Sequence, residues 1–189
     1  MDTSLRPYHL NRDELLAGLD HIRAAPRDHG RLDAIVVRPS HGERLDVGSV
    51  EITAAGGLAG DHWAKGCWKS LADGSPDPDV QVCMMNARCI ALIAQERANW
   101  PPAGDNLFID MDLTPENLPP GTRLGLGSAE IEITAVAHNG CDGFIARYGR
   151  DACVFVNTGE GKRLRLRGIY ARVIKDGRVS VGDRAVKIG

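Results

Sequence analysis

The sequence predicts a mainly β fold, a barrel-like domain with a few inserted helices and an N-terminal helix. Short apolar runs separated by Gly, Pro and Asp turn signals fill the chain from Leu32 onward, which is typical of antiparallel sheets that close into barrels. Two segments within this pattern instead carry apolar residues at helical spacing. The chain has 189 residues, 43% of them hydrophobic, which is enough for one domain with a sizeable core.

The first predicted element is an amphipathic helix over residues 11–25. Asn11 is placed to cap it, and the stretch from Pro26 to Gly30 ends it. Its apolar face is formed by Leu15, Leu16, Leu19 and Ile22. We therefore expect an N-terminal helical lead-in over residues 1–30 and a β-rich domain over residues 31–189.

Strands are expected in the apolar runs that follow, and helices in the two segments with a helical period. The runs are LDAIVVRP, VEITAAGGLAGDHW, VQVCMMN, NLFIDMDL, TRLGLG, AEIEITAVA and IYARVIKDGRVSVGDRAVKIG. The helices are predicted over residues 86–100, which begin with a capping Asn, and over residues 142–157. Residues 69–79 are predicted to form a mobile loop, and the Asp176-Gly177 dipeptide predicts a two-residue β-hairpin.

Composition narrows the class of partner. The formal net charge is -2 and the pI is near 6.3, so the totals show no excess of basic residues for nucleic acid or an anionic membrane. No apolar run approaches the roughly 18 residues of a spanning helix, and the N-terminus lacks the order of charges of a secretion signal. We expect a cytoplasmic protein that binds small molecules or other proteins, and neither nucleic acid nor membrane.

The five cysteines form an odd set without a CxxC pair, which argues against a disulfide framework and against a structural zinc site. Cys83, Cys89 and Cys153 lie in apolar runs, where a free cysteine packs as a small hydrophobe. Cys67 lies in a Gly- and Asp-rich loop five residues after His62, so an exposed thiol or a metal site there is an open alternative.

Cys141 is the strongest candidate for chemistry. In AVAHNGCDGF it lies between a strand-like run and a helix-like run and has a glycine close on each side, which places its thiol on a loop. A thiol is a nucleophile or metal ligand only as the thiolate, and a helix N-terminus or a nearby cation favours that form. His138 is a candidate proton acceptor or hydrogen-bond donor, or an ordinary loop histidine.

Four polar groups of residues accompany this cysteine. They are GDHW with Lys65, Asn86 with Arg88, GDNL with NLPPG, and RLRLRG at 163–168. Each group alone is equally explained by turns, helix caps or the outward face of a strand. Among the cations we favour Arg167 over Arg88 and Lys65, because Arg167 directly precedes Gly168, where backbone and ligand can approach closely.

The order of these groups resembles the MOSC family, named for the C-terminal domain of molybdenum cofactor sulfurases. The resemblance runs from about Leu32 to the end and rests on GLAGDHW, MNAR, GDNLFIDMDL, NLPPGTRLGLGSAEIEIT, HNGCDGF, RLRGIYARV and VGD. Two positions depart from the family pattern. Asp105 replaces the commoner Glu before Asn-Leu, and Gly140 replaces the Pro that often precedes the cysteine.

The resemblance implies a β-barrel-like fold and a cleft with one reactive cysteine, which maps to Cys141. In the family this cysteine is thought to carry sulfur as a persulfide or to bind molybdenum in a pterin cofactor. The resemblance further implies cofactor-binding roles for Arg167, Lys65, Arg88, Asn86, Asn106, Asp61, His62 and Asn139. No pyridoxal phosphate is expected, because the chain lacks the aminotransferase-like domain with a Schiff-base lysine that is fused to some relatives.

Three functions stay open at this point. The leading one is a stand-alone MOSC domain that binds a molybdenum-pterin cofactor or carries sulfur on Cys141, with a sulfur-donor desulfurase as partner. The second is a molybdenum-dependent reductase of N-hydroxylated compounds that works with separate electron-donor proteins, as relatives linked to hydroxylaminopurine resistance suggest. The third is a non-catalytic module that binds an anion or a pterin.

Overall fold

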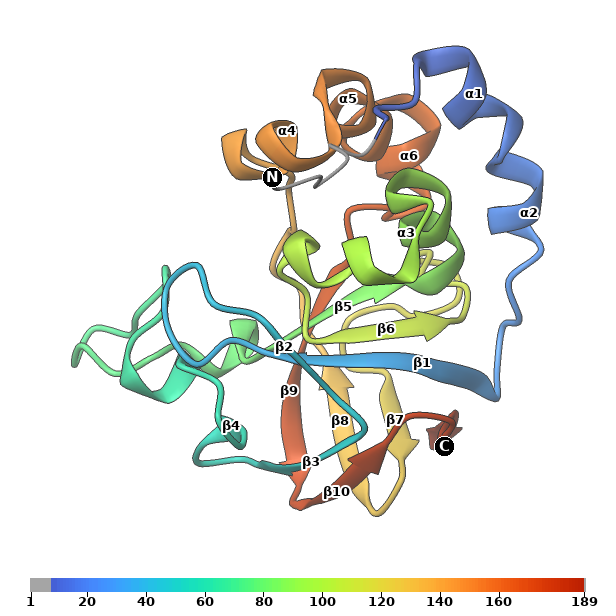
Figure 1. Cartoon of the computed structure of the whole chain (residues 1–189). Helices are drawn as coiled ribbons and strands as arrows, with labels where there is room; N and C mark the ends of the chain where they lie inside the picture. The colour runs from blue at the N-terminus through green and yellow to red at the C-terminus, as the bar shows by residue number, and fades with distance from the viewer. Residues whose placement is uncertain (1–7, 189) are drawn as a thin grey trace.

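The computed structural model describes residues 8–188 and shows a closed seven-stranded β-barrel with helices gathered at one end (Figure 1). Neighbouring strands are antiparallel except for the parallel pair β5 and β6. An eighth strand, β2 (Leu45–Val47), extends the sheet beside β1. Around the barrel the order is β1 (Gly30–Val37), β6 (Leu107–Asp110), β5 (Val82–Asn86), β9 (Ile169–Lys175), β8 (Ala129–Ile133), β7 (Arg123–Leu126) and β11 (Arg184–Ile188), which closes on β1. The predicted mainly β, barrel-like fold is confirmed.

A second, three-stranded sheet corrects the predicted hairpin. It contains β10 (Gly177–Ser180), β3 (Ser49–Thr53) and β4 (Gly57–Leu58), so β10 pairs with β3 and not with the preceding β9. The chain turns away at Asp176, whose Oδ1 accepts a hydrogen bond from the Ala54 amide at 2.8 Å. The chain does turn at Asp176, but the strand that follows this turn, β10, pairs with the distant β3.

Glycines divide two of the three predicted helices into shorter ones. The predicted helix over residues 11–25 is α1 (Arg12–Ala17) and α2 (Leu19–Arg23), separated by Gly18, which packs directly on Leu92. Asn11 caps α1 as predicted and forms a capping box with Glu14. The predicted helix over residues 142–157 is α4 (Asp142–Tyr148) and α5 (Arg150–Asn157), separated by Gly149, and a further helix that was not predicted, α6 (Gly159–Arg163), follows them.

One α-helix and two 3₁₀ turns lie between β5 and β6. The predicted helix over residues 86–100 is α3 (Ala87–Ala94), capped by Asn86, and it ends at Gln95, whose φ of 61° is left-handed. The 3₁₀ turns η3 (Arg97–Asn99) and η4 (Pro101–Ala103) follow it. Two others, η1 (Trp63–Lys65) and η2 (Pro78–Val80), lie in the long connection that precedes β5.

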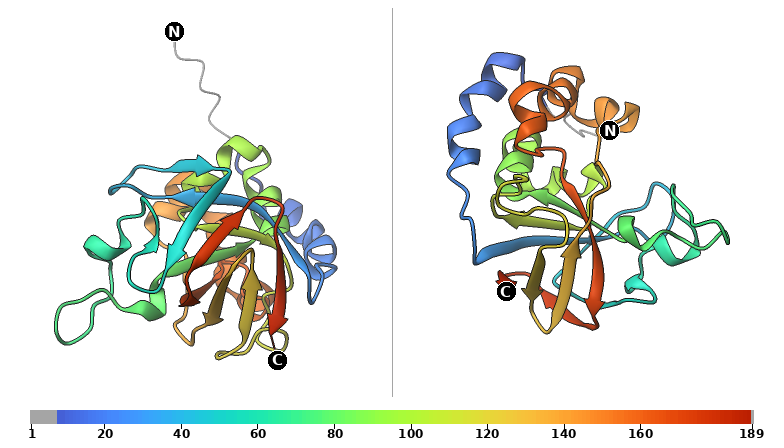
Figure 2. Two further views of the ribbon diagram at one scale, coloured as in Figure 1. Left: turned by 90° about the horizontal axis from the view of Figure 1, so that it is seen from below. Right: turned by 180° about the vertical axis from the view of Figure 1, so that it is seen from behind.

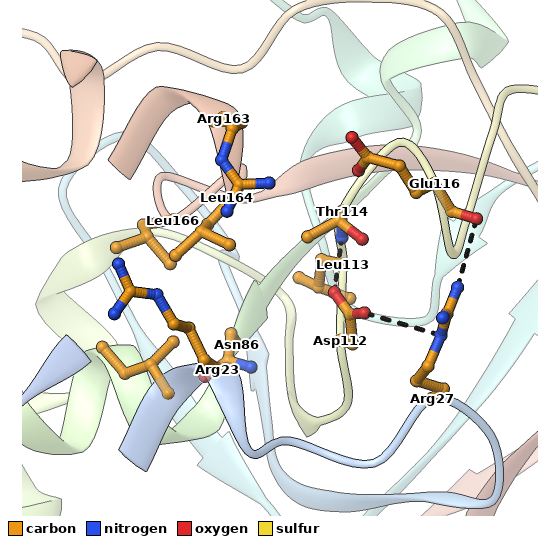
Figure 3. Close-up of a pocket in the computed structure, with 11 residues that line it drawn as sticks. Arg23, Arg27, Asn86, Asp112, Leu113, Thr114, Glu116, Arg163, Leu164 and Leu166 are labelled. Carbon is orange, nitrogen blue, oxygen red and sulfur yellow. Dashed lines mark hydrogen bonds and ion pairs between the residues drawn. The ribbon is translucent and has the colours of Figure 1, made fainter. Parts of the chain in front are cut away.

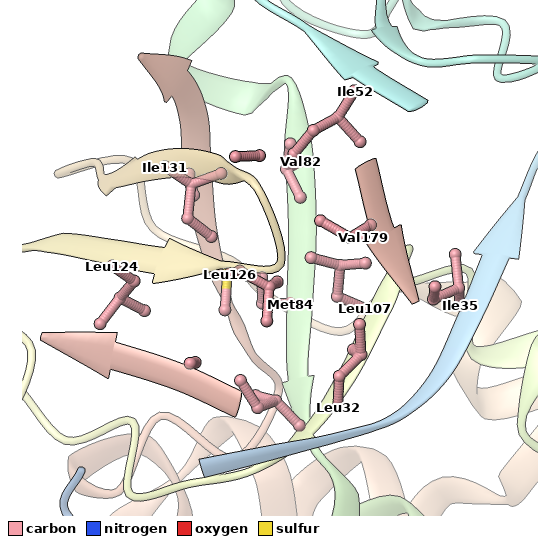
Figure 4. Close-up of a cluster of buried hydrophobic side chains, with 14 of the residues drawn as sticks. Leu32, Ile35, Ile52, Val82, Met84, Leu107, Leu124, Leu126, Ile131 and Val179 are labelled. Carbon is pink, nitrogen blue, oxygen red and sulfur yellow. The ribbon is translucent and has the colours of Figure 1, made fainter. Parts of the chain in front are cut away.

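Two large apolar clusters make up most of the core. One fills the barrel and includes Leu32, Met84, Leu107 and Ile131 (Figure 4). The other lies between the barrel and the helices, and the apolar faces of α1 and α2 contribute to it together with α3 and α5. Figure 2 shows the same helical layer from behind. Fully burying each such side chain stabilises the fold by about 1.5–3 kcal/mol before the loss of chain entropy is counted.

The N-terminal helices share this second cluster with the rest of the chain, and β1 begins at Gly30. The division at residue 30 stays a prediction, and residues 1–7 and 189 lie outside the described residues. Within residues 8–188 no helix is both long and apolar enough to cross a membrane.

Candidate functional site

Cys141 lies at the end of the loop that leads from β8 to α4, and its side chain is exposed. It is the N-cap residue of α4, and its carbonyl oxygen accepts hydrogen bonds from the amides of Phe144 and Ile145. Cys83, Cys89 and Cys153 are buried as predicted, whereas Cys67 is half-buried. Cys141 is therefore the one exposed thiol among the five, all of which the structure describes.

Asn157, the last residue of α5, holds the residue just before this cysteine. Its Oδ1 accepts from the Gly140 amide at 2.8 Å, and its Nδ2 contacts the Gly140 carbonyl at 3.4 Å and the Cys153 Sγ at 3.2 Å. A Cβ at position 140 would lie 2.7 Å from the Asn157 Nδ2. A proline there would also remove the amide that donates to Asn157, so Gly140 is explained by its local contacts.

We expect Asn157→Ala to loosen this loop more than it unfolds the protein. The variant loses the hydrogen bonds of a half-buried side chain to the Gly140 peptide, worth roughly 1 kcal/mol of unfolding free energy, and frees that peptide. Hydrogen exchange should show faster exchange of the Gly140 amide. Asn99→Ala is a suitable control, since Asn99 also donates from its side chain to one backbone carbonyl, at 3.3 Å. Equal exchange rates of the Gly140 amide in both variants would mean that the Asn157 side chain does not hold this peptide in place.

Beneath the loop lies a buried charged cluster of Arg167, Asp105 and His138. The Arg167 Nη1 donates to the Asp105 Oδ2 at 2.8 Å, and its Nη2 donates to the Ala103 carbonyl at 3.2 Å. The Arg167 guanidinium also stacks on Phe144, with the Cζ 5.0 Å from the ring centroid. Since Phe144 belongs to the first turn of α4, this stacking ties the cation to the helix that begins at Cys141.

Three polar atoms of this cluster are buried without a hydrogen-bond partner among the described residues: the Asp105 Oδ1, the His138 Nδ1 and the Arg167 Nε. The first two face each other at 3.5 Å. Burial raises the pKa of Asp105 against the opposing effect of Arg167, and burial lowers the pKa of His138 well below its usual value, with Arg167 and Arg38 acting in the same direction. His138 is thus held in the neutral form near pH 7.

Gly168 lies against His138 and Asp105 and leaves no room for a side chain. Its φ of 115° is left-handed, and a Cβ there would lie 2.3 Å from the Met84 carbonyl oxygen and 3.1 Å from the His138 Nδ1. The His138 ring in turn stacks on Tyr170 at 4.4 Å between centroids. The close approach at Gly168 is thus to the Met84 backbone and the His138 ring, and the predicted approach of a ligand stays a prediction.

A second buried network lies next to the first and joins two of the predicted polar groups. The Arg38 guanidinium holds the Asp61 carboxylate with two bonds, at 2.8 and 3.0 Å, and the Asn106 Nδ2 donates to the same carboxylate at 2.9 Å. Asn106 also accepts from the Cys83 amide, and the His62 Nδ1 contacts the Arg38 carbonyl at 2.7 Å. Burial raises the pKa of Cys83 to about 11, with Arg38 opposing it, so this thiol is protonated.

The side chains predicted for the site do not gather in one place. Arg167, His138 and Asn139 line one pocket of about 280 Å³, and Cys141, which follows two residues after Asn139, is not among the residues that line it. Asp61, His62 and Asn106 lie in the network around Arg38, where their polar atoms hold the backbone and each other. Lys65 is exposed at the end of η1.

Asn86 and Arg88 lie elsewhere and do not line the pocket with Arg167, contrary to expectation. The Arg88 guanidinium binds the Asp110 carboxylate, with its Nε 2.6 Å from Oδ1, and donates to the His21 carbonyl. It therefore joins α2, α3 and β6. Asn86 caps α3 and donates to the Met111 carbonyl, and it borders a different pocket with Arg23 and Arg27 (Figure 3). Both side chains are occupied by structural contacts.

Sequence reasoning missed Arg38, Asn157 and Tyr170, and it named Asp105 only as part of a motif. Arg38 lies near the end of an apolar strand run and Asn157 ends a predicted helix. These positions can be read from the sequence, but the residues that the two side chains contact cannot. Only the barrel brings Arg38 to Asp61 and Asp105 to Arg167, which are 23 and 62 residues apart. Among the described residues, no three His, Cys, Asp or Glu side chains are grouped to hold a metal ion, so the Cys67 and His62 pair gains no further ligand.

Comparisons with known proteins agree with this fold. Residues 73–186 match the MOSC domain family. Three solved structures are similar: YuaD from Bacillus subtilis (16% identity, 82% of this chain and 93% of that chain, TM-score 0.55), YiiM from Geobacillus stearothermophilus (14%, 85% and 75%, 0.56) and YiiM from Escherichia coli (21%, 84% and 70%, 0.53). No curated protein matches the sequence. At these identities the similarity to the solved structures concerns the fold alone.

Proposed function

Because the chain belongs to the MOSC domain family, we propose that its site works in molybdenum-cofactor chemistry, with Cys141 as the reactive thiol. The observation that carries the proposal is the exposed Cys141 at the end of a loop whose preceding residues, His138 and Asn139, line a pocket rich in cations. The other four thiols are buried or half-buried, which leaves this one accessible to a partner protein.

The residues fit a molybdenum-pterin group in two respects. Thiolate sulfur is a ligand of transition metals, and the Arg167 Nε and His138 Nδ1 are buried polar atoms with no protein partner among the described residues. Cys141 would bind the metal, while Arg167, His138 and Asn139 would hold polar atoms of the ligand. When bound, the group supplies two-electron oxidation and reduction at the metal.

For sulfur carriage the chain needs only Cys141. Its thiolate attacks the outer sulfur of a donor persulfide, R–S–SH, so that the donor S–S bond breaks and a new S–S bond forms on Cys141. The donor leaves as R–S⁻, and the proton stays on the transferred sulfur. Burial lowers the pKa of His138 well below its usual value, which makes this side chain a weak proton acceptor, so we propose that solvent takes the proton of the exposed Cys141 thiol before the attack.

The test is the content of protein purified from a host that makes molybdenum cofactor. We expect either stoichiometric molybdenum with pterin or, after exposure to a sulfane-sulfur donor, a persulfide on Cys141. Both should be lost in Cys141→Ser and kept in Cys67→Ser. A loaded protein that also reduces N-hydroxylated compounds with an electron donor would favour the reductase over the sulfur carrier. Equal loading of Cys141→Ser and the unsubstituted protein would overturn the proposal.

Thiol labelling gives a second prediction, because access to reagent follows burial. Limited alkylation of the native protein should label the peptide with Cys141 first and that with Cys67 second, whereas Cys83, Cys89 and Cys153 should react only on unfolding. Peptide mass analysis measures the order. Labelling of the three buried thiols before Cys141 would favour a binding module in which Cys141 is an ordinary loop residue.

A further inference from the structure

A separate pocket of about 320 Å³ lies between the helices and the loop that follows β6 (Figure 3). One wall comes from the ends of α2 and α6 and includes Arg163. The facing wall comes from residues 112–116, which follow β6. Of the residues that line this pocket, only Arg163 also lines the pocket beside Arg167, and Cys141 lines neither. The two pockets are therefore different sites.

The Arg163 guanidinium is held at this pocket by Glu160. Its Nε donates to the Glu160 Oε2 at 3.1 Å and its Nη2 donates to Oε1 at 2.6 Å, while the Arg23 Nη2 donates to the same carboxylate at 3.1 Å. These hydrogen bonds lower the pKa of Glu160 to about 2, so this carboxyl is ionised at neutral pH. The Arg163 Nη1 makes no hydrogen bond or ion pair with residues 8–188. It is a cationic donor available to a ligand.

The facing wall offers acceptors. Thr114 lines the pocket and is only 9% exposed, and its hydroxyl has no hydrogen-bond partner in the described part of the chain. Buried polar side chains normally have a partner, so this hydroxyl indicates a site that a ligand completes. The Glu116 side chain is exposed, and its carboxylate makes no hydrogen bond or ion pair among the described residues. Asp112, in contrast, already accepts from the Thr114 amide at 2.9 Å.

The lining between these polar groups is apolar. It consists of side chains that are at most 8% exposed, those of Ile22, Leu113, Leu164 and Leu166. The pocket thus combines a cationic donor on one wall, an anionic acceptor on the other and an apolar surface between them. A ligand with a single charge would satisfy only one of the two walls.

We propose that this pocket binds an aliphatic α-amino acid in its zwitterionic form. The carboxylate of the ligand would accept hydrogen bonds from Arg163, and its ammonium group would donate to Glu116 and to the Thr114 hydroxyl. Its side chain would lie on the apolar lining, and the volume leaves room for a molecule of the size of leucine. Neither Cys141 nor the pocket beside Arg167 takes part, so the inference goes beyond the proposed function.

The experiment is a titration of ¹⁵N-labelled protein with leucine, leucinamide and 4-methylpentanoate, followed by NMR. Leucine should bind about tenfold more tightly than leucinamide, which lacks the carboxylate, and than 4-methylpentanoate, which lacks the ammonium group. The amide resonances of Thr114 and Glu116 should shift, whereas that of Asn139, which lines the other pocket, should not. Absence of leucine binding, or an affinity for either analogue equal to that for leucine, would overturn the proposal.

Variants then assign each charge to its wall. Arg163→Gln should abolish the preference for leucine over leucinamide, and Glu116→Gln should abolish the preference over 4-methylpentanoate. Each preference is a ratio of two affinities in the same variant, so a small change in stability does not affect it. Arg150→Gln and Glu51→Gln are the matched controls, since both residues are exposed and neither lines the pocket. Equal losses in the controls would mean that net charge alone attracts the ligand and would refute the site.

A last variant separates this inference from the proposed function. Cys141→Ser should bind leucine with unchanged affinity, whatever it does to sulfur or molybdenum loading, because Cys141 does not line the pocket. Loss of leucine binding in Cys141→Ser would contradict a site independent of the thiol. Failure of the unsubstituted protein to bind leucine would refute this site and leave the loading of Cys141 unaffected.

Discussion

Asp105→Asn is expected to lower the free energy of unfolding by about 3 kcal/mol, because it leaves the buried Arg167 guanidinium without its counter-charge. Asp105 is fully buried, and its carboxylate lies 2.8 Å from the Arg167 Nη1. Asparagine has nearly the same size, so packing changes little and the lost charge dominates. Denaturant unfolding at pH 7 measures the change.

Arg167→Met should lower the free energy of unfolding by less than Asp105→Asn does, because the charge that each substitution leaves behind differs in whether it can be neutralised. A guanidinium stays charged at any accessible pH, whereas the Asp105 carboxyl can take up a proton, and its pKa is already raised by burial. Methionine would still pack against Phe144.

The pH dependence of Arg167→Met follows from the same pKa. Without Arg167 the folded-state pKa of Asp105 rises further above that of the unfolded chain, so the folded protein binds more protons. Its stability should therefore fall as pH rises above about 4, until the pH exceeds the folded-state pKa. A stability of Arg167→Met that rises across this range would contradict the assignment.

An exposed ion pair supplies the control for Asp105→Asn. The Glu51 carboxylate lies 2.7 Å from the Arg178 Nε, as close as the buried pair, but half of the Glu51 side chain is exposed. Glu51→Gln should cost at most about 1 kcal/mol, because solvent replaces the lost partner. Equal costs for Glu51→Gln and Asp105→Asn would show that the buried cluster adds no more stability than a surface pair.

Gly168→Ala is expected to destabilise the fold by about 2–5 kcal/mol and to displace His138. Two effects add. A left-handed φ costs an alanine about 1–2 kcal/mol, and the new Cβ would lie 2.3 Å from the Met84 carbonyl oxygen, an overlap that costs another 1–3 kcal/mol, roughly, to relieve. His138 must also move, since its Nδ1 would be 3.1 Å away.

Gly66→Ala separates the two effects. Gly66 has a φ of 136°, and a Cβ there would have no neighbour within 4 Å. This control should show the backbone cost alone, about 1–2 kcal/mol. The chemical shift of the His138 ring should change in Gly168→Ala and not in Gly66→Ala. Equal destabilisation by both substitutions, with no change at His138, would mean that Gly168 is needed only for its backbone conformation.

The loop that carries Cys141 could be predicted from the sequence, and so could most of the strands. Alternating apolar residues and turn signals are local properties, and β5, β6, β7, β8 and β9 lie within the runs that show them. The burial of Cys83, Cys89 and Cys153 followed from the same apolar context. The predicted hairpin at Asp176 was wrong because strand pairing is not a local property. The strand β10 pairs with the distant β3 and not with β9, its neighbour in sequence.

The sequence by itself determined the fold class, the family and the exposed position of Cys141, because periodicity, turn residues and motif order are written along the chain. Tertiary structure alone decided which charged residues meet. Arg88 and Arg167 both adjoin motifs, yet one joins two helices to β6 and the other is buried against Asp105. Barrel closure and strand register set these distances, and neither is encoded in the spacing of the residues concerned.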